Sequence, residues 1–218
     1  MTTMRSTLLR KELVLNLIPT EWLFLLLTLL VFVPNYPYHI VFFYQLLSVF
    51  FIFLGARTNN DMGFSMLLPV RKRDLVLARV LHIVVAELAM LALGAVMIAI
   101  RQALRLGTNV IGLDANSALI GSVLIMYGLF NAIFLIMFYA QADKVAVPMI
   151  VATTVSVLYV VAVAASTFLV PVMRHLDTND PEFFVEKLVF VLVGAVLYVV
   201  LNVLAYRVSA ARFEKVDL

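Results

Sequence analysis

The chain has 218 residues, of which 64% are hydrophobic and 13% are charged, and its mean hydropathy is +1.08. Soluble domains carry roughly a quarter charged residues, so this composition excludes an ordinary water-soluble fold. The formal charge of +3 implies no nucleic-acid partner, because the basic residues stand in short loops beside apolar runs, where they set membrane orientation. The chain has no cysteine and therefore forms neither disulfides nor thiolate metal sites.

The N-terminal part is predicted to lie on the membrane and then to enter it. Residues 3–12 mix leucines with basic residues, which is typical of a short interfacial helix. The apolar run at residues 22–33 would be only ~18 Å long as a helix, whereas the hydrocarbon core is ~30 Å thick. The first span is therefore predicted at residues 13–33, and Pro19 inside it is expected to kink it.

Five more apolar runs of transmembrane length follow in chain order. They are predicted to form helices at residues 38–56, 80–100, 117–138, 145–170 and 182–206. The last run has a helix-start signal, with Asp180 as N-cap, Pro181 at the first helical position and Glu182 in the first turn. No connection reaches ~50 residues, the lower limit for an independent domain. Residues 1–218 are therefore predicted to form one all-α, polytopic membrane domain with six transmembrane helices.

The basic residues are divided unequally between the two sides of the predicted bundle. Four lie on one side: Arg101, Arg105, Arg174 and Lys187. Twelve lie on the other side: Arg5, Arg10, Lys11, Arg57, Arg71, Lys72, Arg73, Arg79, Lys144, Arg207, Arg212 and Lys215. Short cytoplasmic loops carry an excess of Lys and Arg, so both termini and the loop at residues 57–79 are predicted to be cytoplasmic.

The loop at residues 57–79 is too apolar for a solvated linker. Its large apolar side chains are Met62, Phe64, Met66, Leu67, Leu68 and Val70. Pro69 interrupts the chain before a basic cluster that leads into the third span. This combination favours docking against another protein. The alternative is that the basic residues anchor the third span to anionic headgroups while the apolar residues lie in the interface.

The order of features in this loop resembles that of bacterial type-2 ABC exporter permeases. These small six-span subunits carry Leu-Pro-x-x-Arg-x-(Asp/Glu)-(Leu/Ile)-Val-x-(Ala/Ser)-(Lys/Arg) between spans two and three. The matching positions here are Leu68, Pro69, Arg71 or Lys72, Asp74, Leu75, Val76, Ala78 and Arg79. The family commonly has Ser or Thr at the position of Arg71, so the start of the corresponding helix in this chain stays open.

The resemblance implies a function and a set of partners. A coupling helix within residues 67–79 would dock on a separate cytoplasmic ATPase subunit through Leu67, Leu68, Pro69, Arg71, Lys72, Arg73, Asp74, Leu75 and Arg79. The permease would work as a homo- or heterodimer in the bacterial inner membrane. It would export an amphipathic or hydrophobic substrate, such as a peptide, an antibiotic or a lipid-like molecule. Importers of the superfamily carry a Glu-Ala-Ala motif that this chain lacks, which favours export.

No catalytic site is predicted in the chain itself. A phosphate-binding loop needs Gly-x4-Gly-Lys-Ser/Thr, and the only such glycine spacing, at Gly107 and Gly112, continues with Leu-Asp. The chain is therefore not expected to be an enzyme or to hold a cofactor, and ATP and Mg²⁺ would bind to the partner ATPase. The histidines have no carboxylate at metal-ligand spacing, and no nucleophile–base pair can be assembled from the sequence, so neither a metal site nor a catalytic site is expected.

Glu87 is the deepest carboxylate of the predicted spans, and an ionisable residue at that depth is by default a functional candidate. It is a candidate for a substrate path or the dimer seam, and the alternative is a structural hydrogen bond inside the bundle. Tyr127 and Asn131 share a helix face and are candidates for the same path or for interhelical hydrogen bonds. Asn202 is a weaker candidate.

Two other functions stay open at this point. One is a membrane adaptor, without transport activity, that anchors or regulates another protein through the loop at residues 57–79. The other is a proton-coupled secondary transporter that uses Glu87. The absence of recognisable internal symmetry counts against the second, since many such carriers are built from repeats.

Overall fold

The computed structural model describes residues 19–67, 70–109, 112–141, 144–179 and 181–216. All regular secondary structure within these ranges is helical. In chain order the elements are α2 (Pro19–Leu26), the 3-10 helix η1 (Leu27–Phe32), α3 (Tyr38–Thr58), α4 (Asp61–Met66), α5 (Lys72–Ala103), α6 (Ser117–Phe138), α7 (Ala146–Leu169), α8 (Pro171–Asp177), the 3-10 helix η2 (Pro181–Phe183) and α9 (Phe184–Phe213). The predicted interfacial helix at residues 3–12 lies outside the described residues.

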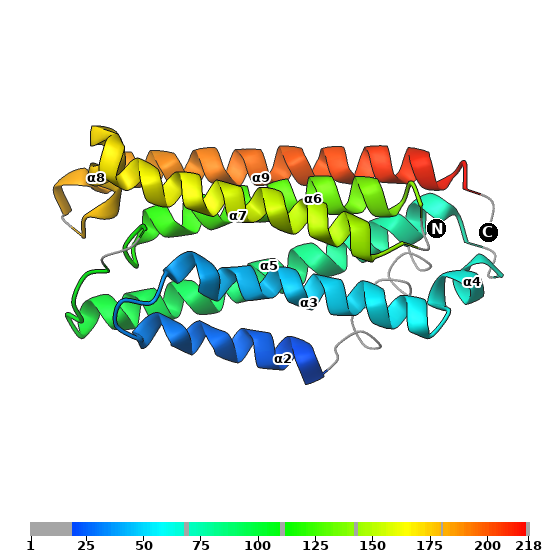
Figure 1. The fold of residues 1–218 in the computed structure, drawn as a ribbon, viewed down its shortest axis with the longest axis horizontal. Helices are drawn as coiled ribbons and strands as arrows, with labels where there is room; N and C mark the ends of the chain where they lie inside the picture. The colour runs from blue at the N-terminus through cyan, green and yellow to red at the C-terminus, as the bar shows by residue number, and fades with distance from the viewer. Residues whose placement is uncertain (1–18, 68–69, 110–111, 142–143, 180, 217–218) are drawn as a thin grey trace.

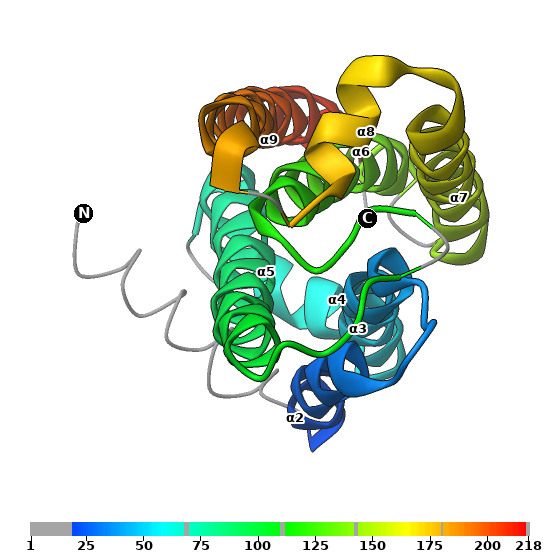
Figure 2. The same cartoon turned by 90° about the vertical axis from the view of Figure 1, so that its left-hand side faces the viewer.

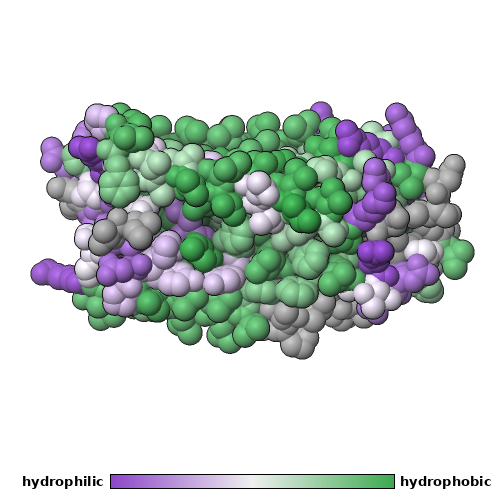
Figure 3. Space-filling model, in the orientation of Figure 1, coloured by the Kyte–Doolittle hydropathy of each residue, from purple (hydrophilic) through white to green (hydrophobic). Residues whose placement is uncertain are grey.

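Five of these helices, α3, α5, α6, α7 and α9, are long and apolar enough to cross a membrane. They run along the long axis of the molecule, with α4 and the end of α9 at one end and α8 at the other (Figure 1); we call these the α4 end and the α8 end. A broad hydrophobic band separates the hydrophilic side chains at the two ends (Figure 3). The prediction of an all-helical, polytopic membrane protein is confirmed. Within the described residues, five helices rather than six have transmembrane length.

The first helical segment is short in its described part. Eight residues of α-helix and six of 3-10 helix are ~24 Å long at rises of ~1.5 and ~2.0 Å per residue. Phe24 and Val31 face the bundle, whereas Trp22 and Leu29 on the other side are exposed. The residues before Pro19 lie outside the described ranges, and with them the predicted kink.

α6 is the most buried of the long helices, and α3, α5, α7 and α9 surround it in the view from the α8 end (Figure 2). Glycines bring α6 and α9 close together. A Cβ atom at Gly121 would lie 2.9 Å from the carbonyl oxygen of Phe190, and one at Gly194 would meet the backbone of Gly121. Small residues are typical of close contacts between membrane helices, because they let the two backbones touch.

α5 is longer than the predicted third span at residues 80–100, because it begins at Lys72 and ends at Ala103. Arg101, predicted to open a loop, therefore lies in the last turn of α5. Its buried guanidinium donates hydrogen bonds to the carbonyl oxygens of Val31 at 3.0 Å and Gly107 at 2.5 Å. These two bonds attach the end of α5 to η1 and to the loop that follows.

The predicted polar loop between the fifth and sixth spans is partly helical. α8 follows α7 directly, has a proline in its first turn and buries Leu176. η2 starts at Pro181, in agreement with the predicted helix start, whereas the predicted N-cap Asp180 lies outside the described residues. Loop residues thus pack against the α8 end of the bundle.

Candidate functional site

Residues 59–67 form a corner at the α4 end of the bundle, which we call the α4 corner (Figure 1). Asn60 has a left-handed backbone (φ 50°) and turns the chain after α3. The carboxylate of Asp61, in the first turn of α4, accepts a hydrogen bond of 2.8 Å from Arg79 Nη2. The Arg79 side chain is buried, and its guanidinium lies 5.3 Å from the centre of the Phe53 ring. α4 is therefore braced against both α5 and α3.

The outer surface of the α4 corner is apolar, since Phe64 is 58% exposed and Leu67 is 84% exposed. Full burial of a large apolar side chain gains ~1.5–3 kcal/mol, so both residues are suited to contact an apolar surface. Of the predicted coupling residues, Leu67 lies on this corner, whereas Leu68 and Pro69 lie outside the described residues. The short helix of this loop precedes the predicted stretch at residues 67–79.

Two of the basic residues that follow the corner are tied to the end of α9. Arg73 donates two hydrogen bonds to the carboxylate of Glu214, at 2.5 and 2.8 Å. Lys72 Nζ donates to the carbonyl oxygen of Val216 at 2.7 Å. The Arg73 guanidinium holds the pKa of Glu214 below its usual value. The start of α5 and the end of α9 are thereby fixed to each other.

The remaining predicted coupling residues lie at the start of α5. Arg71 is the N-cap residue, so the helix begins at Lys72 without a Ser or Thr cap. Its guanidinium pairs with Asp74 at 3.0 Å across the first turn. Leu75 is half-buried against the core of the bundle. Leu67 and Arg71 are therefore exposed, whereas Leu75 contacts the bundle.

A second site lies at the middle of the long helices. Glu87 is near the midpoint of α5 and is completely buried. Its Oε2 atom accepts hydrogen bonds from Tyr198 OH at 2.6 Å and from Asn131 Nδ2 at 2.9 Å. Asn131 Nδ2 also donates to Asn202 Oδ1 at 3.0 Å. The carboxylate therefore joins α5, α6 and α9.

The other carboxylate oxygen of Glu87, Oε1, has no hydrogen-bond partner among the described residues, and neither has Oδ1 of Asn131. A buried polar atom without a partner costs about 1–3 kcal/mol, so such atoms are rare in a packed core. A carboxylate that is bonded on one oxygen and open on the other is suited to bind and release a proton there. The cluster therefore holds α5, α6 and α9 together, and Oε1 is the carboxylate oxygen of Glu87 that is open to protonation.

The structure separates the predicted members of this site. Asn131 contacts Glu87, but the Tyr127 hydroxyl donates to the carbonyl oxygen of Phe42 on α3, at 3.0 Å. Tyr198, which sequence reasoning misses, donates the shortest hydrogen bond of the cluster. Tyr198 and Asn202 are four residues apart and share a helix face, and this spacing is the signal that points to them.

A buried Ser–His contact joins α3 and α6, although no nucleophile–base pair is expected from the sequence. His39 Nε2 lies 2.8 Å from Ser122 Oγ, and Tyr159 OH on α7 lies 3.0 Å from the same oxygen. Ser122 is completely buried and so presents no nucleophile to water. The contact serves as an interhelical hydrogen bond.

Acidic residues hold the loops together at the α8 end. Asp114 accepts a hydrogen bond from the backbone N–H of Asn109, and its own N–H donates to Asp177 Oδ1 at 2.8 Å. Burial raises the pKa of Asp114 to about 6, and the charge of Asp177 acts in the same direction. Asn116 caps α6 by accepting hydrogen bonds from its first N–H groups.

Among the described residues, no group of three or more His, Cys, Asp or Glu side chains is arranged to hold a metal ion. No family model matches the chain, and no significant match is found among curated proteins or solved structures. Three features therefore bear on the function: the resemblance of residues 57–79 to the loop of ABC exporter permeases, the α4 corner and the Glu87 cluster.

Proposed function

We propose that this chain is the membrane-spanning permease subunit of an ABC exporter and is driven by a separate ATPase subunit. The observation that carries the proposal is the α4 corner, where Phe64 and Leu67 project from a short helix that Arg79 attaches to the membrane helices. A partner that buries both side chains gains ~3–6 kcal/mol from apolar burial. A few such anchors supply most of the affinity of an interface.

The Arg79–Asp61 pair would transmit movement of the partner to the membrane helices. Arg79 is buried beside Phe53, and pulling Asp61 away from it would break a largely buried ion pair. A partner that displaces α4 should therefore displace α5 and α3 as well. The end of α9 should follow, since Arg73 and Glu214 attach it to the start of α5.

The proposed topology has six spans, with the α4 end in the cytoplasm. Residues 19–32, with the residues before them, would supply the sixth span, and the exposed side chains among residues 22–32 are apolar like those of the long helices. The excess of Lys and Arg on the predicted cytoplasmic side supports this orientation in a bacterial inner membrane. Six spans make half of a transporter, so the working unit would contain a second permease copy and two ATPase subunits.

The proposal is tested by co-purification in detergent with an ATPase encoded by a neighbouring gene, followed by ATP turnover in reconstituted vesicles. Phe64→Ala combined with Leu67→Ala should weaken the association at least about tenfold, because each truncation removes an anchor. The matched control is Phe168→Ala combined with Leu169→Ala, which alters a Phe–Leu pair of similar exposure near α8.

Two results would overturn the exporter proposal. If no ATPase co-purifies with the unaltered chain, the chain is not an ABC permease. If the Phe64/Leu67 variant binds and stimulates the ATPase as well as the control does, the α4 corner does not couple the two proteins, and the adaptor function gains support.

A proton-coupled carrier is the second candidate, and the open Oε1 atom of Glu87 favours it. Glu87→Gln retains an oxygen that accepts from Tyr198 and Asn131 but loses the exchangeable proton. In an ABC exporter this variant should keep substrate-stimulated ATP turnover. Transport that a pH gradient drives without ATP, and that Glu87→Gln abolishes, would select the carrier instead.

A further inference from the structure

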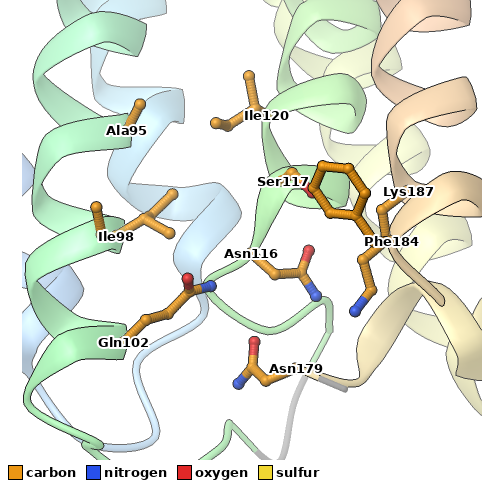
Figure 4. A pocket seen from close by; sticks show the side chains of 10 residues that line it. Ala95, Ile98, Gln102, Asn116, Ser117, Ile120, Asn179, Phe184 and Lys187 are labelled. Carbon is orange, nitrogen blue, oxygen red and sulfur yellow. The ribbon is translucent and has the colours of Figure 1, made fainter. Parts of the chain in front are cut away.

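Two cavities lie next to each other at the α8 end of the bundle. The first has a volume of about 390 Å³ and lies between α5, α6 and α9 (Figure 4). The second has a volume of about 380 Å³ and lies beside the loop that follows α5. Gln102 and Asn179 line both cavities, which are therefore adjacent, and we call the two together the α8-end groove. Each volume falls within the range of small-molecule sites, roughly 300–1,000 Å³.

The lining of the α8-end groove changes from apolar to polar along its length. The part nearer the middle of the helices is lined by Ala95, Ile98, Ala99 and Ile120. Toward the end of the bundle the polar side chains of Gln102, Asn179 and Lys187 join the lining, beside the ring of Phe184 (Figure 4). A molecule with an apolar chain and a polar head matches this gradient.

The charged side chains that line the α8-end groove are all basic. Lys187 is only 4% exposed, and Arg101 and Arg105 line the second cavity. The acidic groups of the described residues at this end are Asp114, Asp177, Glu182 and Glu186, and none of them lines either cavity. α6 and α9 also begin here, and the N-terminus of a helix carries a partial positive charge. Such a surface favours an anionic headgroup.

The groove lies where a membrane lipid can reach it. The helices that line it carry exposed apolar side chains beside it, such as Val96 on α5 and Leu188 and Leu192 on α9, and its polar part lies at the end of the bundle. An amphiphile in the surrounding bilayer has the same arrangement, with its chain at the depth of the band and its head at the end. Binding would therefore require little desolvation of the apolar chain.

We propose that the α8-end groove binds an anionic amphiphile, such as a phospholipid with a phosphoglycerol head. The head contacts Lys187 and Arg105, and an acyl chain lies along Ile98 and Ile120. The ligand class goes beyond the exporter proposal, because binding at this groove does not depend on an ATPase partner. One proposal can therefore be wrong while the other is correct.

Native mass spectrometry of the purified full chain tests this proposal with three probes. These are phosphatidylglycerol, phosphatidylcholine with the same acyl chains, and glycerol phosphate. Phosphatidylglycerol should bind at least about tenfold more tightly than phosphatidylcholine, because its net negative charge adds a charge-assisted contact. Glycerol phosphate lacks the chain and should bind too weakly to detect. Equal affinities for the two lipids would overturn the proposal, as would glycerol phosphate that binds as tightly as the lipid.

Two variants test the two parts of the groove separately. Lys187→Gln should weaken phosphatidylglycerol binding about tenfold and leave phosphatidylcholine unaffected. Ala99→Phe fills the apolar part without altering a charge and should weaken binding of both lipids. The controls are Lys144→Gln, far from the groove, and Ala92→Phe, an exposed position of α5 outside the groove lining. If both groove variants bind phosphatidylglycerol as well as their controls do, the proposed site is wrong.

Discussion

Removal of the acid that braces the α4 corner should loosen the corner and destabilise the bundle. Asp61 and Arg79 lie 2.8 Å apart, with side-chain exposures of 22% and 6%. Breaking a buried ion pair by removing one partner costs roughly 3–5 kcal/mol, because the other charge stays buried. Since the Asp61 side keeps some contact with water, we expect Asp61→Asn to lower the free energy of unfolding by about 2–3 kcal/mol.

Thermal unfolding in detergent, with hydrogen exchange at residues 59–67 as the local readout, measures this effect. At roughly 2–4 °C per kcal/mol for a chain of this size, the melting temperature should fall by about 4–12 °C. The control is Glu214→Gln, which removes the acid of a pair whose side chains are 60% and 42% exposed and should lower the melting temperature less than Asp61→Asn does. Equal melting temperatures for the two variants, or unchanged hydrogen exchange at residues 59–67, would refute the claim that the Asp61–Arg79 pair stabilises the α4 corner.

Three further predictions concern helix packing, pH and orientation. Gly194→Leu should lower the melting temperature, because the new side chain would meet the backbone of α6. Val196→Leu, at an exposed position of the same helix, should not lower it. Equal effects of the two changes would contradict the close contact between α6 and α9. The raised pKa of Asp114 means that the folded protein binds this proton more tightly than the unfolded chain. The melting temperature should therefore rise as the pH falls from about 7 through about 6 toward about 4, and a slope that Asp114→Asn leaves unchanged would assign the effect to another group. In a chain without native cysteine, Asn35→Cys should react with an impermeant maleimide on intact cells and Asn60→Cys only after lysis, and the opposite pattern would reverse the orientation.

Composition and apolar runs suffice to predict the class of this protein. Long apolar segments in a chain with few charges have no stable alternative to membrane helices, since every backbone polar group must be bonded within the segment. α6 has the predicted bounds, 117–138, because a local signal, the Asn116 cap, marks its start. α5 is longer than the predicted third span, because the helix continues through Lys72 and Arg73 as far as the α4 end, and the sequence has no cap signal that marks this start.

The α4 corner is harder to predict, because a six-residue helix is too short for a periodic pattern. Its apolar composition is visible in the sequence, and this is why a docking segment is expected in the loop. The left-handed backbone of Asn60 and the bond between Asp61 and Arg79 depend on contacts between elements. These contacts place the exposed anchors at Phe64 and Leu67.

The depth of Glu87 identifies it as a candidate from sequence, but its partners come from two other helices. Asn202 is only a weaker candidate in the sequence and Tyr198 is missed, and the close packing of α6 on α9 brings both into the Glu87 cluster. The burial of Lys187 cannot be predicted from the sequence either, because the sequence places this residue at the polar end of a loop. Polar sites between helices therefore require the tertiary structure.

Site-specific photo-crosslinking from Leu67 in intact membranes tests ATPase docking most directly. Leu67 is highly exposed, so a crosslinker there should reach a partner without disturbing the bundle. We expect a product that contains an ATPase subunit, identified by mass spectrometry, and no such product from Leu169 at the far end of α7. A product with lipid alone from Leu67, or the same ATPase product from both positions, would contradict the proposal that the α4 corner couples this chain to ATP hydrolysis.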